Sequence, residues 1–152
     1  MSNTLTQDLK KGLKAESERV ADFEKVFGPL TKTGTYDNFD WMNEKKHFYV
    51  EHKERAIKFG TYGDLFFDRI KYDKYLEIKK EDPFARCFII WTCSGESYIW
   101  EMCDQFDAED NACFYFSRRM MDRRKGHGWK PQELVNVFIE EIVRFKDFQL
   151  YK

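Results

Sequence analysis

The sequence predicts a single α/β domain in which helices flank a mixed β-sheet, arranged in two or three layers. Three observations predict it: amphipathic helical stripes near both ends of the chain, two short segments with period-two alternation, and one nearly continuous apolar run of strand length. The 152 residues fit one compact domain, and an aromatic content of 18% excludes a disordered chain. Without repeats or a dividing linker, residues 1–152 form one domain.

Composition excludes several classes of protein. Lys and Arg total 26 against 27 Asp and Glu, so a histone-like basic protein is excluded. We expect no membrane segment, because no run approaches the roughly 18 apolar residues that a span needs. The N-terminus lacks the apolar core of a signal peptide, and the cysteines and histidines do not have zinc-site spacing. We therefore expect an intracellular protein, in the cytoplasm or nucleus, with reduced thiols.

The first predicted element is an amphipathic helix from Gln7 to Phe27, which Gly28 and Pro29 end. Its apolar residues recur at three- and four-residue steps, and Glu16 falls within their stripe. A carboxylate on the buried face is costly unless a neighbour compensates its charge. A shared metal ion or a salt bridge would each do so.

A β-hairpin is predicted next, from alternating aromatic and polar residues at 38–42 and 47–53. With Lys45 and Lys46 at its tip, Asp40 lies directly opposite Glu51. One face is then expected to carry Phe39, Trp41, Phe48, Val50 and His52. The other is expected to carry Asp40, Tyr49, Glu51 and Lys53.

The rest of the chain supplies a short strand at 64–67, a helix at about 70–80 with Ile70, Tyr75 and Ile78 among its apolar positions, and a strand at 86–93 covered on both faces. A turn at 94–96 leads into a partner strand, and a further short strand is predicted at 113–116. Pro131 favours the start of a last helix, whose buried stripe would be Leu134, Phe138, Ile142 and Phe145.

The hairpin carries the predicted chemistry. Directly opposed Cβ atoms lie about 4.5–5.5 Å apart, so Asp40 and Glu51 repel one another unless a cation lies between them. Hard oxygen ligands suit Mg²⁺, which commonly binds one or two carboxylates together with substrate phosphate. Lys53 projects beside the same place, where its ammonium can hold a phosphate oxygen or align a water molecule.

Asp40, followed after ten residues by Glu51-His52-Lys53 at the end of an apolar strand, resembles the PD-(D/E)xK nuclease superfamily. The resemblance covers residues 10–105 and leaves about 106–152 as a C-terminal extension. It implies a restriction-endonuclease-like α-β-β-β-α-β core and a Mg²⁺- or Mn²⁺-dependent nuclease. Asp40 and Glu51 would be metal ligands, Glu16 an additional ligand and Lys53 the catalytic lysine. The sequence departs from the motif in having Phe39 where proline is expected.

Arg55, which continues the Lys53 side of the hairpin, and basic residues further along the chain are the candidates for contact with nucleic acid, for which DNA is favoured. They are Arg55, Lys71, Lys74, Arg118, Arg119, Arg123, Arg124 and Lys125. Solvated turns and helix faces explain the same clusters without a ligand. The expectation is a deoxyribonuclease, and the alternatives are an inactive nucleic-acid-binding module of the same fold or a protein-interaction domain. The sequence leaves open whether two copies of the chain form a homodimer.

Overall fold

The computed structural model describes residues 18–34, 39–104, 112–122 and 129–150. A helix occupies 18–27, and the elements that follow are β1 (Thr31–Lys32), β2 (Trp41–Asn43), β3 (Phe48–Arg55), β4 (Asp64–Asp68), α2 (Arg69–Glu81), β5 (Arg86–Cys93), β6 (Glu96–Glu101), β7 (Phe114–Asp122), β8 (Trp129–Phe138) and β9 (Val143–Arg144). Single 3₁₀ turns lie at Ile139–Glu141 and Phe145–Asp147. Part of the predicted N-terminal helix, at 7–17, lies outside the described residues.

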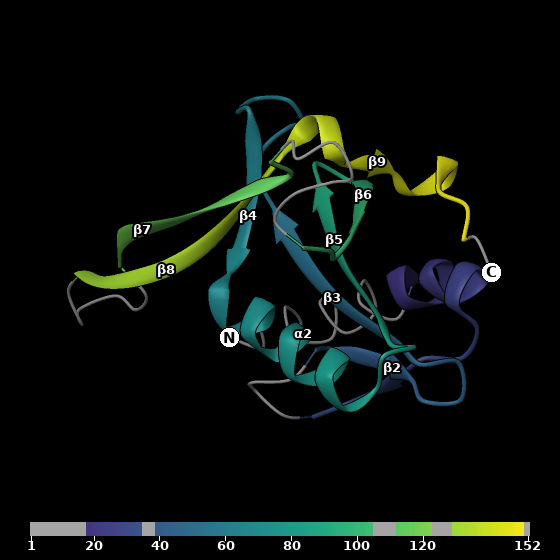
Figure 1. Cartoon of the computed structure of the whole chain (residues 1–152). Coiled ribbons are helices and arrows are strands. Elements are labelled where there is room, and N and C mark those ends of the chain that lie inside the picture. The colour runs from purple at the N-terminus through teal and green to yellow at the C-terminus, as the bar shows by residue number, and fades with distance from the viewer. Residues whose placement is uncertain (1–17, 35–38, 105–111, 123–128, 151–152) are drawn as a thin grey trace, which may run out of the picture.

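The strands form two sheets, which Figure 1 shows side by side. Six strands pair in the order β1-β2-β3-β5-β6-β9, and three in the order β4-β8-β7. Strands β3 and β5 are parallel, with α2 on the connection between them, whereas the other neighbouring strands among the described residues pair antiparallel. The result is a mixed α/β fold. Strand β4, which comes directly before α2, belongs to the smaller sheet. The order of elements along the chain is therefore not a plain α-β-β-β-α-β succession.

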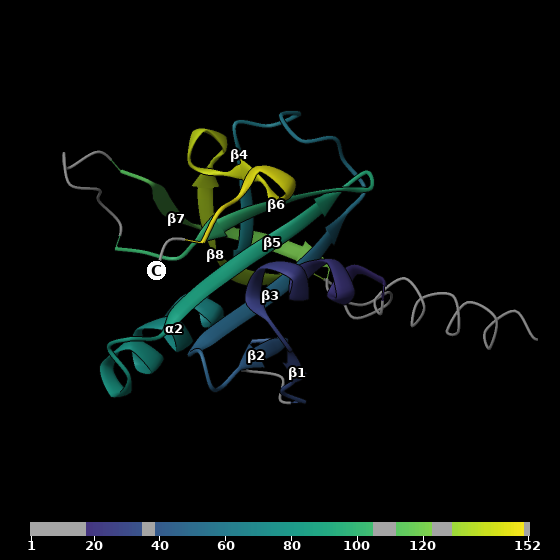
Figure 2. The same ribbon diagram turned by 90° about the vertical axis from the view of Figure 1, so that its right-hand side faces the viewer.

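The larger sheet separates two hydrophobic clusters. On one face, Phe23 and Phe27 of the N-terminal helix pack against Val50, Phe88 and Ile90, together with the C-terminal segment. Figure 2 shows this helix and the C-terminal segment crossing that face of the sheet. The other cluster joins the sheet to α2 and to the three-stranded sheet. The larger sheet is therefore the middle of three layers, and its strand β3 carries Glu51 and Lys53.

The register of the β2–β3 hairpin confirms the prediction: Trp41 pairs with Val50 and Met42 with Tyr49. The predicted placement of Phe39 is wrong. It lies in the cluster on the opposite face, with its ring centroid 6.1 Å from that of Tyr49. Strand alternation does not reach Phe39, because a bend at Asp40 precedes β2.

Helix α2 and the β5–β6 pair also form where the sequence predicts them. Ile70 is the exception within α2, since it is 45% exposed. The helix buries Lys71, Tyr72, Tyr75 and Ile78 instead. Positions 71, 75 and 78 share a face at helical spacing, so a lysine occupies the place that the sequence analysis gave to an isoleucine.

The predicted C-terminal helix is wrong. Residues 129–138 form β8, which lies between β4 and β7 and is buried on both faces around Leu134, Val135 and Val137. A central strand has apolar residues on both faces, so apolar residues also occur at four-residue spacing along it. The positions 134 and 138 therefore fit a helical stripe although they lie in a strand. Pro131 pairs with Met120 in the outer part of the β7–β8 ribbon.

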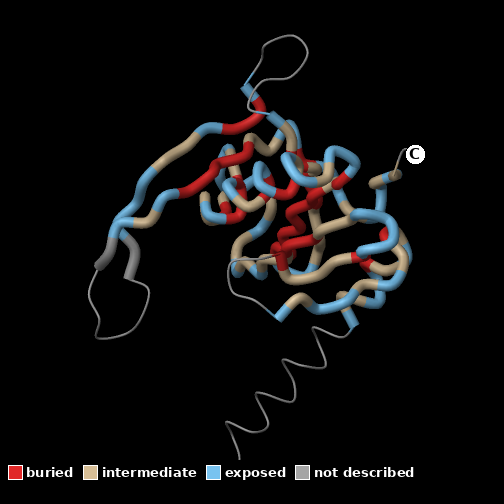
Figure 3. The backbone as a smooth tube through the Cα atoms, turned by 60° about the horizontal axis from the view of Figure 1, so that its bottom comes forward, coloured by how far each residue is buried: buried red, intermediate tan, exposed pale blue. Residues whose placement is uncertain are grey.

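The β7–β8 ribbon extends beyond the rest of the fold, and Figure 3 shows buried backbone giving way to exposed backbone along it. Its inner end packs in the shared core through Phe114 and Val137, while Arg118, Arg119 and Met120 are exposed. Among the described residues, no helix combines the length and the hydrophobicity required to cross a bilayer.

The junction between the N-terminal helix and the hairpin is fixed by Asn43. Its buried side chain donates from Nδ2 to the Phe27 carbonyl (2.8 Å) and accepts from the Lys46 amide (3.1 Å). Gly28 ends the helix with φ at +76°, and a Cβ atom there would lie 3.0 Å from that Nδ2. The helix end and the hairpin tip are therefore held against each other.

Candidate active site

Asp40 and Glu51 lie side by side where β2 begins. The Asp40 amide donates to Oε1 of Glu51 (3.1 Å), and the Asp40 Oδ2 atom accepts from the His52 amide (2.9 Å). The β2–β3 pairing runs only as far as Trp41 and Val50. The Asp40 carboxylate thus accepts a hydrogen bond from a backbone amide of β3 beyond the last strand pair. This hydrogen bond holds the Asp40 side chain beside Glu51.

Two lysines approach the Glu51 carboxylate from different elements. Lys53, two residues further along β3, places its Nζ 3.3 Å from Oε2. Lys71, from α2, places its Nζ 3.6 Å from Oε1. The Lys53 side chain keeps 20% of its exposure, whereas Glu51 and Lys71 are only 3% and 6% exposed. The cluster is therefore open to solvent at Lys53 and closed behind it.

The electrostatics of Glu51 favour a further positive charge. Burial raises the pKa of the Glu51 carboxyl, and the neighbouring Asp40 raises it further, while Lys53 and Lys71 lower it. The two raising effects prevail, so the carboxylate is incompletely compensated despite its two ammonium neighbours. A cation bound between the two carboxylates would relieve this imbalance.

The donor set fits a magnesium-like ion. Two carboxylates supply hard oxygen ligands, and Mg²⁺ commonly keeps several waters and uses only one or two such groups. Within the described residues, no group of three or more His, Cys, Asp or Glu side chains is arranged for metal binding. Asp40 and Glu51 thus form a pair of neighbouring carboxylates, with Lys53 beside them.

Four predicted site residues fall outside the described residues: Glu16, Arg123, Arg124 and Lys125. Lys74 is half-buried on α2, and its Nζ lies 3.7 Å from Glu77. Arg118 is exposed on β7 and pairs in register with Glu133. These two residues lie apart from the Asp40–Glu51 pair, and no contact in the structure joins them to it.

Lys71 takes a different place from the one the sequence suggested. It was expected to present its ammonium to a phosphate backbone from an exposed helix face, but it is buried against Glu51. The signal that identifies it is its spacing from Tyr75 and Ile78, which places it on the buried face of α2. A lysine on that face needs an anionic partner, and Glu51 supplies one.

Arg55 and Arg119 are brought together by β4. Arg55 continues the Glu51 and Lys53 side of β3, and its guanidinium carbon lies 5.1 Å from the ring centroid of Phe66. Arg119, on β7, places its guanidinium carbon 5.0 Å from the same ring. Both residues were predicted to contact nucleic acid, but nothing in the sequence indicated that one phenylalanine links them.

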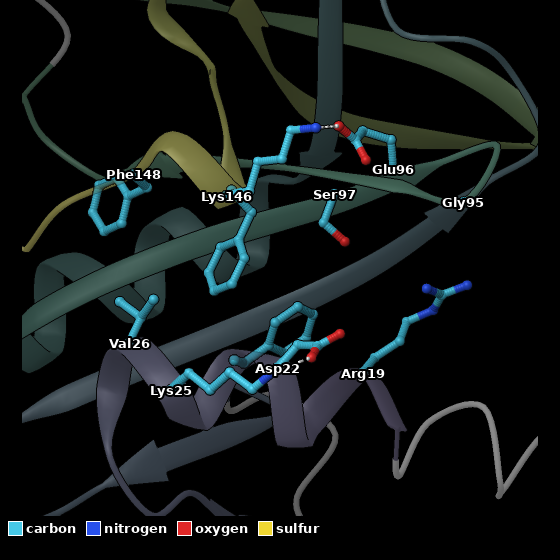
Figure 4. A pocket seen from close by; sticks show the side chains of 11 residues that line it. Arg19, Asp22, Lys25, Val26, Gly95, Glu96, Ser97, Lys146 and Phe148 are labelled. Carbon is cyan, nitrogen blue, oxygen red and sulfur yellow. Dashed lines mark hydrogen bonds and ion pairs between the residues drawn. The ribbon is translucent and has the colours of Figure 1, made fainter.

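A cavity of about 430 Å³ lies on the other face of the larger sheet, between the N-terminal helix and the C-terminal segment. Figure 4 shows its charged side chains joined in pairs, Lys25 to Asp22 and Lys146 to Glu96. Arg19, at its rim, pairs with Glu54. With its charges balanced locally, this cavity has no unpaired group of one sign to select an ionic ligand.

No family model, curated protein or solved structure matches this chain.

Proposed function

We propose that this protein is a divalent-metal-dependent nuclease that hydrolyses phosphodiester bonds, with DNA as its substrate. The observation that carries the proposal is the contact of Asp40 with Glu51, with Lys53 beside them on the same face of β3. Two carboxylates and a lysine at one solvent-accessible point supply the ligands and the positive charge that metal-assisted phosphodiester hydrolysis requires.

The arrangement of the surrounding elements supports a restriction-endonuclease-like core. A helix precedes the β2–β3 hairpin, and α2 returns the chain to β5, which is parallel to β3. The candidate ligands lie on the hairpin, as they do in the PD-(D/E)xK pattern. Strand β4 and the β7–β8 ribbon are additions to that pattern in this chain.

Each residue has a distinct role in the proposed reaction. Asp40 and Glu51 would hold Mg²⁺ or Mn²⁺, which when bound polarises the phosphate and activates water. The Lys53 ammonium, the exposed member of the cluster, hydrogen-bonds the attacking water or a phosphate oxygen and neutralises charge that develops there. Water then adds to phosphorus as the bond to the leaving sugar oxygen breaks. Lys71 holds Glu51 from behind and is a positioning residue.

The test is cleavage of plasmid and linear DNA by the purified protein, with and without Mg²⁺ or Mn²⁺. Lys53→Ala is expected to abolish cleavage and leave the circular-dichroism spectrum unchanged. Lys45→Ala, at the exposed hairpin tip, is the matched control and is expected to cleave normally. Undiminished cleavage by Lys53→Ala contradicts the proposal, as does the absence of metal-dependent cleavage by the unaltered protein.

A second candidate is a nucleic-acid-binding module of the same fold that does not cut. The burial of Lys71 against Glu51 favours it, because an ammonium then already supplies positive charge where a metal would bind. Calorimetric titration with Mn²⁺ distinguishes the two. The nuclease takes up the ion, and Asp40→Asn weakens that uptake. The inactive module takes up none and still binds DNA in a salt-dependent way.

A further inference from the structure

A cavity of about 580 Å³ lies beside the far end of β3, between that strand and β4. Its walls combine two arginines with aromatic side chains. Arg55 and Arg119 contribute the charge, Phe66 lies between the strands that carry them, and Tyr62 at the rim is 63% exposed. Cations and exposed aromatic rings in one concave place are the elements that bind single-stranded nucleic acid.

Within the part of the chain that the structure describes, the two guanidinium groups have no carboxylate partner. Both approach the ring of Phe66, and neither forms an ion pair with Asp, Glu or the chain terminus anywhere in the described residues. Partial burial lowers the pKa of Arg55, because its guanidinium loses hydration, while the nearby Asp68 acts in the opposite direction. Arginine nevertheless stays protonated, so two like charges face one cavity.

The carboxylate that lines the cavity is occupied elsewhere. Asp64 accepts a hydrogen bond from the Tyr115 hydroxyl (2.7 Å) and another from the amide of Asn136 (3.2 Å). Asn136 is fully buried in β8, so its hydrogen bond holds the Asp64 side chain toward the interior of the three-stranded sheet. With two arginines against one aspartate among its lining residues, the cavity keeps a net positive lining, in contrast to the locally balanced cavity of Figure 4.

The cavity and the candidate active site lie along the same strand. Glu51, Lys53 and Arg55 are alternate residues of β3, so their side chains leave the same face at steps of about 6.6 Å. Arg55 also donates to the Phe66 carbonyl (3.5 Å), which ties the end of this row to β4. A strand of nucleic acid with its scissile phosphate at Lys53 would pass directly onto the Arg55 end of the row.

We infer that this cavity is a nucleotide subsite for the single-stranded DNA flanking the scissile phosphate. Arg55 and Arg119 hold the phosphate, and the unstacked base lies against Tyr62. The inference rests on the proposed function and extends it by naming the substrate class. A cleft of this kind favours a strand whose bases are free to leave the stack, because Tyr62 can contact only a base that is not enclosed in a duplex.

Fluorescence anisotropy with fluorescein-labelled single-stranded DNA in EDTA tests the inference without cleavage. Arg119→Gln is expected to weaken binding and to reduce the slope of log affinity against log salt by about 0.7, the value for one lost phosphate contact. Tyr62→Ala is expected to weaken binding about tenfold through lost stacking, with an unchanged slope. Arg69→Gln is the matched control, because Arg69 also lies over a ring, Phe116, but outside the cavity and beside Asp73.

Three results overturn the inference: Arg119→Gln binding like the unaltered protein, an equal loss of slope in Arg118→Gln, or duplex DNA binding as tightly as the single strand with no effect of Tyr62→Ala. The second would show general attraction by the β7–β8 ribbon. Metal-dependent cleavage separates this failure from failure of the proposed function. A protein that cuts normally but shows any of these results lacks the subsite, whereas one that binds as expected but never cuts lacks only the catalysis.

Discussion

Opposing electrostatic effects act on the Glu51 carboxylate. It is buried and beside another carboxylate, yet it forms ion pairs with two lysines from different elements. A buried carboxylate with a raised pKa binds a proton more tightly in the folded protein than in the unfolded chain. Its ionisation therefore costs stability as pH rises between the unfolded pKa, about 4.3, and the higher folded one. Lys71 limits that cost from inside the core.

Replacing Lys71 with methionine should make this cost visible. Lys71→Met keeps the side-chain length but removes one ammonium, so the pKa of Glu51 rises further. Below about pH 4 both states are protonated and the effect is absent. As pH increases, the variant should lose a further ~1.4 kcal/mol of unfolding free energy for each added unit of pKa, up to a plateau. Urea unfolding across this pH range measures the loss.

Lys74→Met is the control, since Lys74 lies on the same helix but pairs with the exposed Glu77. Its stability should parallel that of the unaltered protein at every pH. If Lys71→Met also ran parallel, Glu51 would not depend on Lys71 for its charge balance.

At the scale of elements, the hairpin that carries the candidate ligands is anchored at its tip as well as by its strands. The Asn43 side chain donates one hydrogen bond to the end of the N-terminal helix and accepts another from the Lys46 amide within the tip. The register of β2 against β3 places Asp40 next to Glu51, so an anchor that fixes this register also positions the site.

Asn43→Ala should therefore destabilise the protein by about 1–3 kcal/mol, because the Phe27 carbonyl loses its donor in a buried place. Lys45→Ala, on the exposed side of the same turn, should change stability by less than about 0.5 kcal/mol. Chemical denaturation of both variants measures the difference. Equal stabilities would mean that the tip does not anchor the hairpin.

Local patterns predicted the elements whose burial is decided by near neighbours. Alternation around Lys45 and Lys46 gave the register of β2 with β3, and the apolar run at 86–93 gave β5. Strand β8 was missed because its burial depends on β4 and β7, which flank it from distant parts of the sequence. The role of Lys71 was missed for the same reason, since it depends on how α2 docks against β3.

At the scale of the molecule, the inner parts of the C-terminal strands β7 and β8 belong to the core. Strand β8 pairs with β4, whose Phe66 carbonyl accepts from the buried indole of Trp91 in β5 (3.0 Å). Val135 lies in the cluster between the sheets together with Trp91 and Trp100. The two sheets are therefore expected to unfold together.

Val135→Ala, in the middle of β8, tests this coupling. Loss of two buried methyl groups should cost about 2 kcal/mol. Tryptophan fluorescence, to which Trp91 and Trp100 between the sheets contribute together with Trp41 and Trp129, and far-ultraviolet circular dichroism should show the same lowered midpoint. Separate midpoints for the two signals would indicate that the three-stranded sheet unfolds by itself.

Because β3 pairs in parallel with β5, the candidate site is completed only after α2 and β5 have been synthesised. A polypeptide that has been synthesised only as far as Arg55 already carries Asp40, Glu51 and Lys53, but neither Lys71 nor β5, the parallel neighbour of β3, has been made. Long-range pairings of this kind form only after the intervening chain is available and closed. Prematurely terminated translation products therefore contain all three residues without the architecture that brings them to bear on a substrate.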